Sequence, residues 1–266
     1  MTFWNNRCKN DPTEKAKGSQ NSKTQKQFPQ FVTTYQWENH SLANLSMQAR
    51  MIPLFLVLLL PPHVSASDSV YETFVQCLSN QTNQPDQVSN IVYSQTNPSY
   101  TTVLRAYIRN SRFNTSTTPK PTIIVTPTQE SHVQATVICT KNIGIQLKIR
   151  SGGHDFEGIS YTSDVPFIIL DMFNLRSITI NLQEQTAWAE SGATLGELYY
   201  RIWEKSKVLG FPASICPTVG VGGHLSGGGY GNMLRKHGLS VDHVLDAKLS
   251  WFRYRKLFRF FVLRGV

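Results

Sequence analysis

Glycine is the residue that most constrains this chain, because 15 of its 17 glycines lie between Gly144 and Gly238. They form two clusters: RSGGHDFEG at 150–158, directly after a predicted strand, and CPTVGVGGHLSGGGYG at 216–231. Glycine loses more conformational entropy on folding than other residues, so it is kept where the backbone bends unusually or approaches a ligand closely. The clusters therefore indicate either a flexible Gly-rich surface loop or a concavity of backbone N–H groups that suits a diphosphate.

The chain lacks the standard motifs of several enzyme classes. Neither glycine cluster fits GxGxxG at the start of a helix or GxxxxGK[ST], which excludes the common dinucleotide and P-loop sites. The nucleophile motif GxSxG is also missing, and Cys216 has no neighbour that would activate it. No CxxC or HExxH occurs and the histidines are spread out, so we predict no metal site. The histidines considered are His154, His224, His237 and His243.

The net charge of +9 comes from the two ends of the chain. Residues 1–50 carry seven basic and three acidic side chains, and residues 251–266 carry five basic side chains and no acidic one. The middle, residues 51–250, therefore carries 14 side chains of each sign. A neutral middle lacks the basic surface of a nucleic-acid-binding domain, so we expect no nucleic-acid partner.

An apolar stretch, MIPLFLVLLL at 51–60, is typical of a secretory signal peptide. Arg50 precedes it and small residues follow it, so residues 47–66 form a signal-peptide-like segment with cleavage expected after Ala66. Residues 1–46 are interpreted as a disordered extension, either genuine or the product of a misassigned translation start. The alternative is a buried apolar segment. No apolar run reaches the roughly 18 residues that span a bilayer, so we predict a secreted protein, in the cell wall or vacuole, with no stable membrane span.

The cysteines and glycosylation motifs agree with this route. The four cysteines are Cys8 in the extension and Cys77, Cys139 and Cys216 after the signal-like segment. Because three is an odd number, one disulfide can form and one thiol remains for another purpose. Asn80 and Asn114 lie in glycosylation tripeptides.

Hydrophobic periodicity predicts an α+β or mixed α/β chain. Helices are expected at 69–80, 100–108, 128–142 and 195–208, and strands at 122–126, 145–150, 167–170, 177–180 and 186–189. A polar linker at 114–121 marks a boundary. The last helix has the clearest start, because Thr194 and Glu197 form a capping box, and Gly210 is expected to end it. Its apolar face, which we assign to the core, consists of Leu195, Leu198, Tyr199 and Ile202.

Three motifs together resemble one protein family. They are RSGGHDFEGISY at 150–161, Cys-Pro-Thr at 216–218, and GGHLSGGGYG at 222–231 followed by RKHGLSVD at 235–242. This combination resembles the berberine bridge enzyme-like flavoprotein oxidases over about residues 70–249. The resemblance implies an α+β FAD-binding domain of the p-cresol methylhydroxylase and vanillyl-alcohol oxidase type, built from two small α+β subdomains. It divides the chain into an N-terminal part at 67–120, an incomplete FAD-binding domain at 121–249 and a divergent tail at 250–266.

The resemblance also implies how FAD is held. His154 matches the histidine bonded to the flavin methyl carbon, Cys216 matches the cysteine bonded to ring carbon six, and Cys77 and Cys139 match the disulfide pair of the family. The residues implied to line the diphosphate are Ser151, Gly152, Gly153 and Asp155, and those implied to pass close to the cofactor are Gly222, Gly223, His224 and Gly228. Family members take a hydride from a small-molecule substrate, and dioxygen reoxidises the flavin and yields hydrogen peroxide.

The chain departs from the family pattern in two places. His243 stands where family members commonly carry asparagine. From Ser250 the sequence SWFRYRKLFRFFVLRGV replaces the expected continuation, and we interpret it as an out-of-frame or intron-derived end in preference to a membrane or nucleic-acid segment. The substrate domain and the catalytic base of the family are missing, so we expect an inactive fragment of an FAD-linked oxidase. The alternative is a non-enzymatic secreted glycoprotein that keeps the scaffold without flavin.

Overall fold

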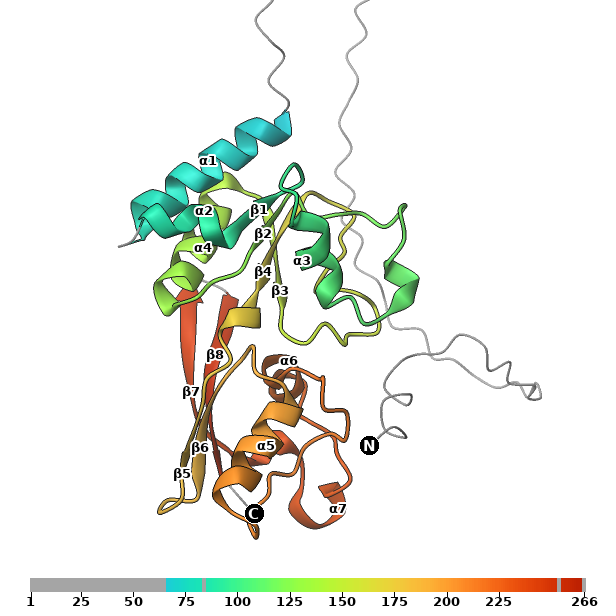
Figure 1. The fold of residues 1–266 in the computed structure, drawn as a ribbon, viewed down its shortest axis with the longest axis vertical. Helices are drawn as coiled ribbons and strands as arrows, with labels where there is room; N and C mark the ends of the chain where they lie inside the picture. Colours follow the sequence, from blue (N-terminus) through green and yellow to red (C-terminus); the bar gives the residue numbers. More distant parts are fainter. Residues whose placement is uncertain (1–65, 83–84, 253–254, 265–266) are drawn as a thin grey trace, which may run out of the picture. The chain divides into compact units, whose positions relative to one another are not determined.

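The computed structural model describes residues 66–82, 85–252 and 255–264 (Figure 1). The predicted extension at 1–46 and all but the last residue of the signal-like segment lie outside the described residues. The helices are α1 Ala66–Gln81, α2 Val88–Ile91, α3 Tyr100–Ala106, α4 Glu130–Ile143, α5 Leu195–Lys205, α6 Val221–Ser226 and α7 Leu234–His237. The strands are β1 Val92–Ser94, β2 Ile123–Val125, β3 Gln146–Arg150, β4 Phe167–Asp171, β5 Ile178–Asn181, β6 Thr186–Glu190, β7 Val244–Phe252 and β8 Arg255–Arg264. Short 3-10 helices occupy 85–87, 111–113, 172–174 and 240–243.

The first subdomain, α1–α4 with β1–β4, is built on a sheet in the order β1-β2-β4-β3. β2, β4 and β3 run parallel, and β1 pairs antiparallel with β2. All residues of β2 and β4 are buried, as expected for parallel strands covered on both faces. Helices α1 and α4 pack on one face and α3 packs on the other (Figure 1). Because β1 pairs with β2, the sheet continues across the polar linker at 114–121.

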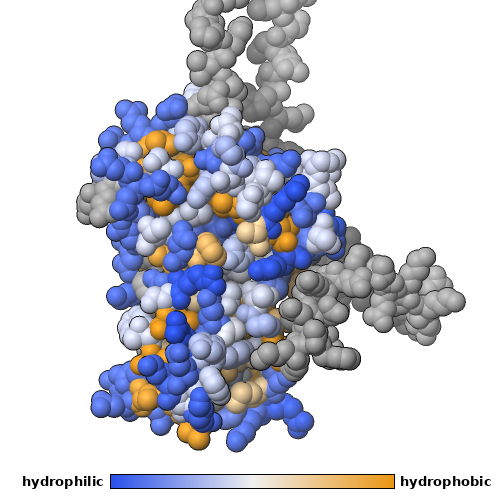
Figure 2. Space-filling model, in the orientation of Figure 1, coloured by the Kyte–Doolittle hydropathy of each residue, from blue (hydrophilic) through white to orange (hydrophobic). Residues whose placement is uncertain are grey.

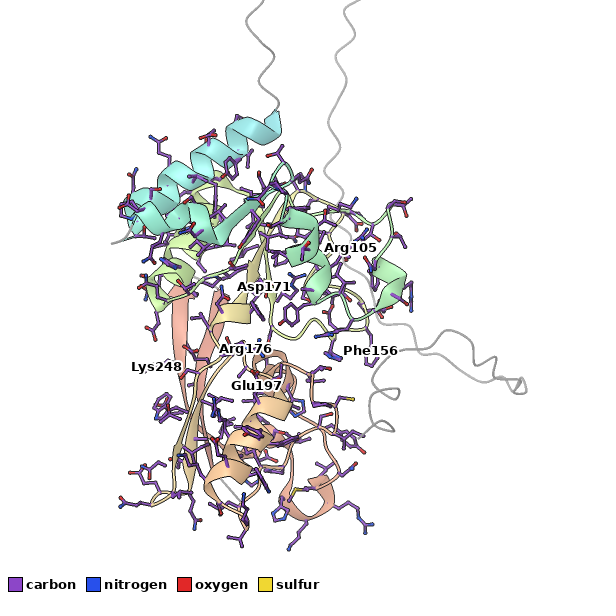
Figure 3. The ribbon with its side chains drawn as sticks, in the orientation of Figure 1. Arg105, Phe156, Asp171, Arg176, Glu197 and Lys248 are labelled. Atoms are coloured by element: carbon purple, nitrogen blue, oxygen red, sulfur yellow. A yellow bond between two sulfur atoms is a disulfide. The ribbon has the colours of Figure 1, made fainter. Side chains whose placement is uncertain are left out.

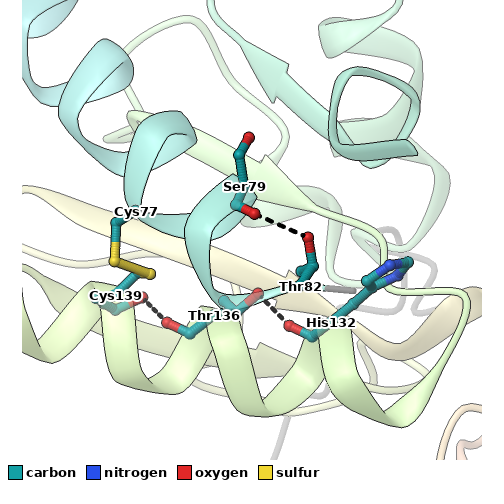
Figure 4. The surroundings of a disulfide bond; sticks show 7 residues. Cys77, Ser79, Thr82, His132, Thr136 and Cys139 are labelled. Atoms are coloured by element: carbon teal, nitrogen blue, oxygen red, sulfur yellow. Dashed lines mark hydrogen bonds between the residues drawn. A yellow bond between two sulfur atoms is a disulfide. The ribbon is translucent and has the colours of Figure 1, made fainter. Parts of the chain in front are cut away.

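A disulfide joins α1 to α4 in the first subdomain. Cys77 and Cys139 form the bond that the family resemblance implied, across a sequence separation of 62 residues (Figure 4). By the loop-entropy model, a cross-link of this span stabilises the folded state by about 3–5 kcal/mol. Helix α4, predicted at 128–142, ends at Gly144, whose φ of 76° is the left-handed conformation of a helix C-cap.

The second subdomain, β5–β8 with α5–α7, is an antiparallel sheet in the order β5-β6-β8-β7. Its inner face packs on α5 and α6 and buries Ala189, Leu198 and Val221. Strand β8 lies between β6 and β7, although residues 250–266 were interpreted as a divergent tail. Leu263 of this strand is buried with the core. The two small α+β subdomains confirm the predicted fold class.

Helix α5 belongs to the second subdomain and begins as the sequence predicts. The Glu197 backbone N–H donates to Thr194 Oγ1, and Glu197 Oε2 accepts from the Thr194 N–H at 2.9 Å, which completes the capping box. Arg176 Nε also donates to Glu197 at 3.2 Å, and Figure 3 shows the two side chains together. The predicted end at Gly210 is wrong. The helix stops at Lys205, because the Ser206 hydroxyl accepts from the backbone N–H of the residues that follow and starts a turn instead.

The surface carries its apolar side chains in separate patches. On the face shown in Figure 2, hydrophobic groups are divided by hydrophilic ones. Asn80 and Asn114, in the predicted glycosylation tripeptides, are both exposed. In the described part of the chain, no helix has the length and apolar character needed to cross a membrane.

Candidate cofactor-binding site

Both glycine clusters line one cavity of about 1210 Å³. Its wall includes the loop that follows β3, the segment around Cys216 and the first turns of α6. Of the ten residues predicted to contact the cofactor, nine lie on it: Ser151, Gly152, Gly153, His154, Asp155, Cys216, Gly222, Gly223 and His224. Gly228 is outside the lining, and its φ of 94° serves the turn after α6. The cavity exceeds the usual range of small-ligand pockets, roughly 300–1,000 Å³, so it suits a large ligand.

The two glycine clusters touch each other through their backbones. A Cβ on Gly152 would overlap the backbone nitrogen of Gly220, and a Cβ on Gly220 would overlap the Ser151 hydroxyl. The Ser151 Oγ donates to the Ser191 carbonyl at 2.6 Å, which fixes the loop after β3 to the strand end of β6. Glycine is therefore required at these positions for close approach of two segments, and the flexible-loop interpretation is wrong for them.

His154 is oriented by the second cluster. Its Nε2 lies 2.9 Å from Thr218 Oγ1, two residues beyond Cys216 in the sequence. Burial lowers the pKa of the His154 imidazole, and the nearby Arg109 charge lowers it further, against smaller opposing effects from Thr218 and Asp155. The ring is thus neutral near pH 7, with Nε2 engaged and Nδ1 left for another partner.

The lowered pKa gives a pH prediction. We expect the His154 imidazole to titrate below its ordinary value of 6.5, as followed by NMR of the histidine ring signals between about pH 5 and pH 8. Because the unfolded state then binds the proton more readily, the free energy of unfolding should fall as the pH drops through 6.5. His154→Gln should reduce that pH dependence. A His154 midpoint at or above 6.5 would contradict the neutral-ring assignment.

His224, on the glycine-rich helix α6, is held by contacts with Ser214 and Ser240. Its Nε2 accepts from the Ser214 backbone N–H at 3.3 Å and lies 3.0 Å from Ser240 Oγ. Burial lowers the pKa of this imidazole as well. The contacts join α6 to the segment before Cys216, so the two walls of the cavity are held at a defined spacing.

The cavity wall also fits a dinucleotide in its charge and its unused hydrogen-bonding groups. Ser191 Oγ is buried at the wall without a hydrogen-bond partner, which is uncommon unless a ligand or water supplies one. Arg109 and Lys148 add two positive charges to the lining. The Asp155 carboxylate accepts from the Ser160 hydroxyl at 2.5 Å, so it is used in the loop's own turn. These residues fit the charge and size of FAD.

Two expectations for the site concern metal ligands and a free thiol. In the part of the chain that the structure describes, no group of three or more potential metal ligands occurs. None of the described cysteines is a free thiol either, which differs from the expected unpaired thiol. A bond between Cys216 and a flavin therefore requires the sulfur to be reduced when the cofactor enters.

Several site residues escaped the sequence analysis. Thr218 and Gly220 lie inside the quoted motifs, and the Cys-Pro-Thr sequence is the signal that could have found the first. Ser191 lies two residues beyond the predicted strand at 186–189 and directly after the observed strand β6. Arg109 and Lys148 reach the cavity from segments without any local motif, because only the tertiary fold brings them there.

Comparisons with known proteins agree with this site. The family model described as "FAD binding domain" matches residues 121–250, so the described cavity belongs to an FAD-binding protein. Berberine bridge enzyme-like 21 of Arabidopsis thaliana is 63% identical over 201 residues, which are 74% of this chain and 37% of that protein. Tetrahydroberberine oxidase of Berberis wilsoniae is 54% identical over 191 residues, 72% of this chain and 35% of that protein.

Solved structures show the same relationship. Phl p 4, a grass pollen allergen with glucose dehydrogenase activity, superposes with a TM-score of 0.68 at 35% identity, covering 73% of this chain and 44% of that one. A variant of berberine bridge enzyme superposes with a TM-score of 0.68 at 34% identity, covering 74% and 43%. The chain therefore belongs to the berberine bridge enzyme-like family of FAD-linked oxidases, and it spans less than half the length of these relatives.

Proposed function

We propose that this chain carries the FAD-binding part of an oxidase in which FAD is bonded to both His154 and Cys216. When bound, FAD supplies the redox chemistry: a hydride is accepted from a small-molecule substrate, and dioxygen restores the oxidised flavin with release of hydrogen peroxide. The observation that carries the proposal is that both side chains line one cavity whose walls are the two glycine clusters. No catalytic base is assigned within the described residues.

The residues of the cavity have distinct parts in this proposal. Backbone N–H groups of Ser151–Gly153 would hold the diphosphate, and Arg109 and Lys148 on the same cavity wall would balance its charge. The neutral imidazole of His154 offers Nδ1 for the bond to the flavin methyl carbon, while Thr218 holds Nε2. Each bond replaces one C–H and one N–H or S–H, so two protons and two electrons leave for each bond, with dioxygen as the acceptor.

A secretory route is part of the same proposal. The exposed Asn80 and Asn114 are accessible for glycosylation, and the Cys77–Cys139 disulfide is of the kind that persists in an oxidising compartment. Two covalent bonds to FAD would prevent loss of the cofactor from a protein in dilute surroundings, such as the cell wall or vacuole.

The test is mass spectrometry of the full chain produced through a secretory pathway. We expect a yellow protein whose colour survives acid precipitation, with peptides containing His154 and Cys216 linked through one flavin. His154→Ala and Cys216→Ala should each retain a single linkage, and the double variant should release FAD on precipitation. His237→Ala, which alters a histidine outside the cavity lining, is the control and should keep both linkages.

The opposite result is equally clear. A colourless wild-type protein in which neither His154 nor Cys216 is modified would contradict the proposal. It would favour the alternative, a secreted glycoprotein that keeps the scaffold without flavin.

A further inference from the structure

Arg150 and Asp171 form a buried ion pair at the last positions of β3 and β4. The two residues are register partners in the parallel ladder, and Arg150 Nη2 lies 2.7 Å from Asp171 Oδ2. Their side chains are 0% and 2% exposed. Asp171 Oδ1 also accepts from the Phe173 backbone N–H at 3.2 Å. In Figure 3, Asp171 lies beside α3, at the end of the first sheet that faces the cofactor cavity.

Arg150 uses its other donors to hold α3. Its Nη1 donates to the Leu104 carbonyl at 2.6 Å, and its Nη2 donates to the Val103 carbonyl at 2.8 Å. Both carbonyls belong to the last turn of α3, where four carbonyl groups have no partner within the helix. One guanidinium therefore joins the ends of two strands to the end of a helix that lies 46 residues earlier in the sequence.

The segment that follows α3 packs against the loop at 151–154. The Tyr107 carbonyl packs so closely on Gly153 that a Cβ there would overlap it. The Arg109 backbone N–H donates to the Gly153 carbonyl at 3.4 Å. Because Arg150 directly precedes the loop and also holds α3, it fixes both sides of the space that the backbone of 151–154 occupies.

Stability alone does not explain this pair. Replacing a buried ion pair by apolar residues of similar volume is often neutral or stabilising. Here Arg150 Nε is buried without a partner, and burial raises the pKa of Asp171 against the opposing effect of Arg150. The Arg150 guanidinium donates in fixed directions to three acceptors: the Leu104 carbonyl, the Val103 carbonyl and Asp171 Oδ2. Apolar side chains of similar volume could not make these hydrogen bonds.

We propose that Arg150 and Asp171 are positioning residues that hold the 151–154 loop against the α3 exit, so that His154 is presented to the cofactor. The cofactor part of this inference rests on the proposed function, whereas the loop geometry does not. The pair acts on His154 only through the backbone, and it reaches the Cys216 segment only through the contacts that the 151–154 loop makes with Thr218 and Gly220.

The test replaces both charges at once, with Arg150→Met and Asp171→Leu in the full chain. Hydrogen exchange followed by mass spectrometry is measured on the apo protein for peptides covering 151–158 and 216–228. We expect exchange in 151–158 to be about 10-fold faster than in the wild type, with a smaller change in 216–228 and the melting temperature within a few degrees. The control exchanges the exposed pair Arg201–Glu204 for Met and Leu, and both peptides should behave as in the wild type.

A second measurement separates this inference from the proposed function. In flavin-loaded protein, the double variant should lose linkage at His154 while keeping linkage at Cys216. If the wild type carries no flavin but the exchange difference is present, the proposed function is wrong and the positioning role of the pair stands. Wild-type exchange in 151–158 of the double variant overturns the inference.

A conservative variant keeps the test decisive if the double variant does not fold. Arg150→Lys retains the charge opposite Asp171 but has no planar fork to reach the α3 carbonyls. It should show faster exchange in 151–158 with an intact Cys77–Cys139 disulfide. Wild-type protection in this variant contradicts the proposal.

Discussion

Replacing Gly153 with alanine is expected to prevent the proposed covalent attachment of flavin and to lower the free energy of unfolding by about 2–5 kcal/mol. Two costs combine. Gly153 has a φ of 66°, which costs a residue with a Cβ about 1–2 kcal/mol. The added Cβ would also overlap the Tyr107 carbonyl oxygen, a backbone atom that cannot rotate away. The loop that carries His154 must then move.

Gly144→Ala is the matched control for this prediction. Gly144 also has a positive φ, 76°, but no atom lies within 4 Å of the position that its Cβ would take. It should therefore lose only the conformational term, about 1–2 kcal/mol, and should keep its flavin. Urea unfolding and flavin absorbance measure both quantities. Equal losses in the two variants would show that contact with Tyr107 does not matter.

Local signals predicted much of the fold. The Thr194–Glu197 capping box sets the start of α5, and α4 ends at Ile143, one residue beyond the predicted range of 128–142, with Gly144 as its C-cap. Strands β2 and β4 were predicted at 122–126 and 167–170, and the structure shows them to be parallel and buried along their whole length. The end of α5 was missed, because the Ser206 hydroxyl accepts hydrogen bonds from the backbone N–H groups of Val208 and Leu209, and this competition with the helix leaves little trace in the hydrophobic pattern.

Sequence reasoning failed where the structure depends on distant pairing. Strand β8 is held between β6 and β7, and the change in composition after Ser250 concealed its part in the sheet. The contact between His154 and Thr218 spans 64 residues, and that between Arg150 and Leu104 spans 46. The glycine clusters indicated that close approach occurs. They did not indicate that the clusters approach each other, which only the fold determines.

Gly223→Ala is expected to abolish flavin binding while leaving the apo protein as stable as the wild type or slightly more stable. Gly223 lies within α6, lines the cavity, and has no atom within 4 Å of its would-be Cβ. Alanine inside a helix is favoured over glycine by about 0.5–1 kcal/mol, so the free energy of unfolding should rise by up to that amount. A methyl group in the cavity, however, would occupy space that the cofactor needs.

Gly222→Ala provides the contrast, because the neighbouring position meets protein instead of open space. Its Cβ would lie 2.8 Å from the Ser191 carbonyl oxygen and 2.9 Å from Ser191 Cβ, so this variant should lose stability and flavin together. Thermal unfolding of the apo proteins and flavin content after acid precipitation distinguish the two. Full flavin content in Gly223→Ala would mean that the cofactor does not approach α6. The open space beside Gly223 would then need another explanation, since a glycine there weakens the helix without benefit to the chain itself.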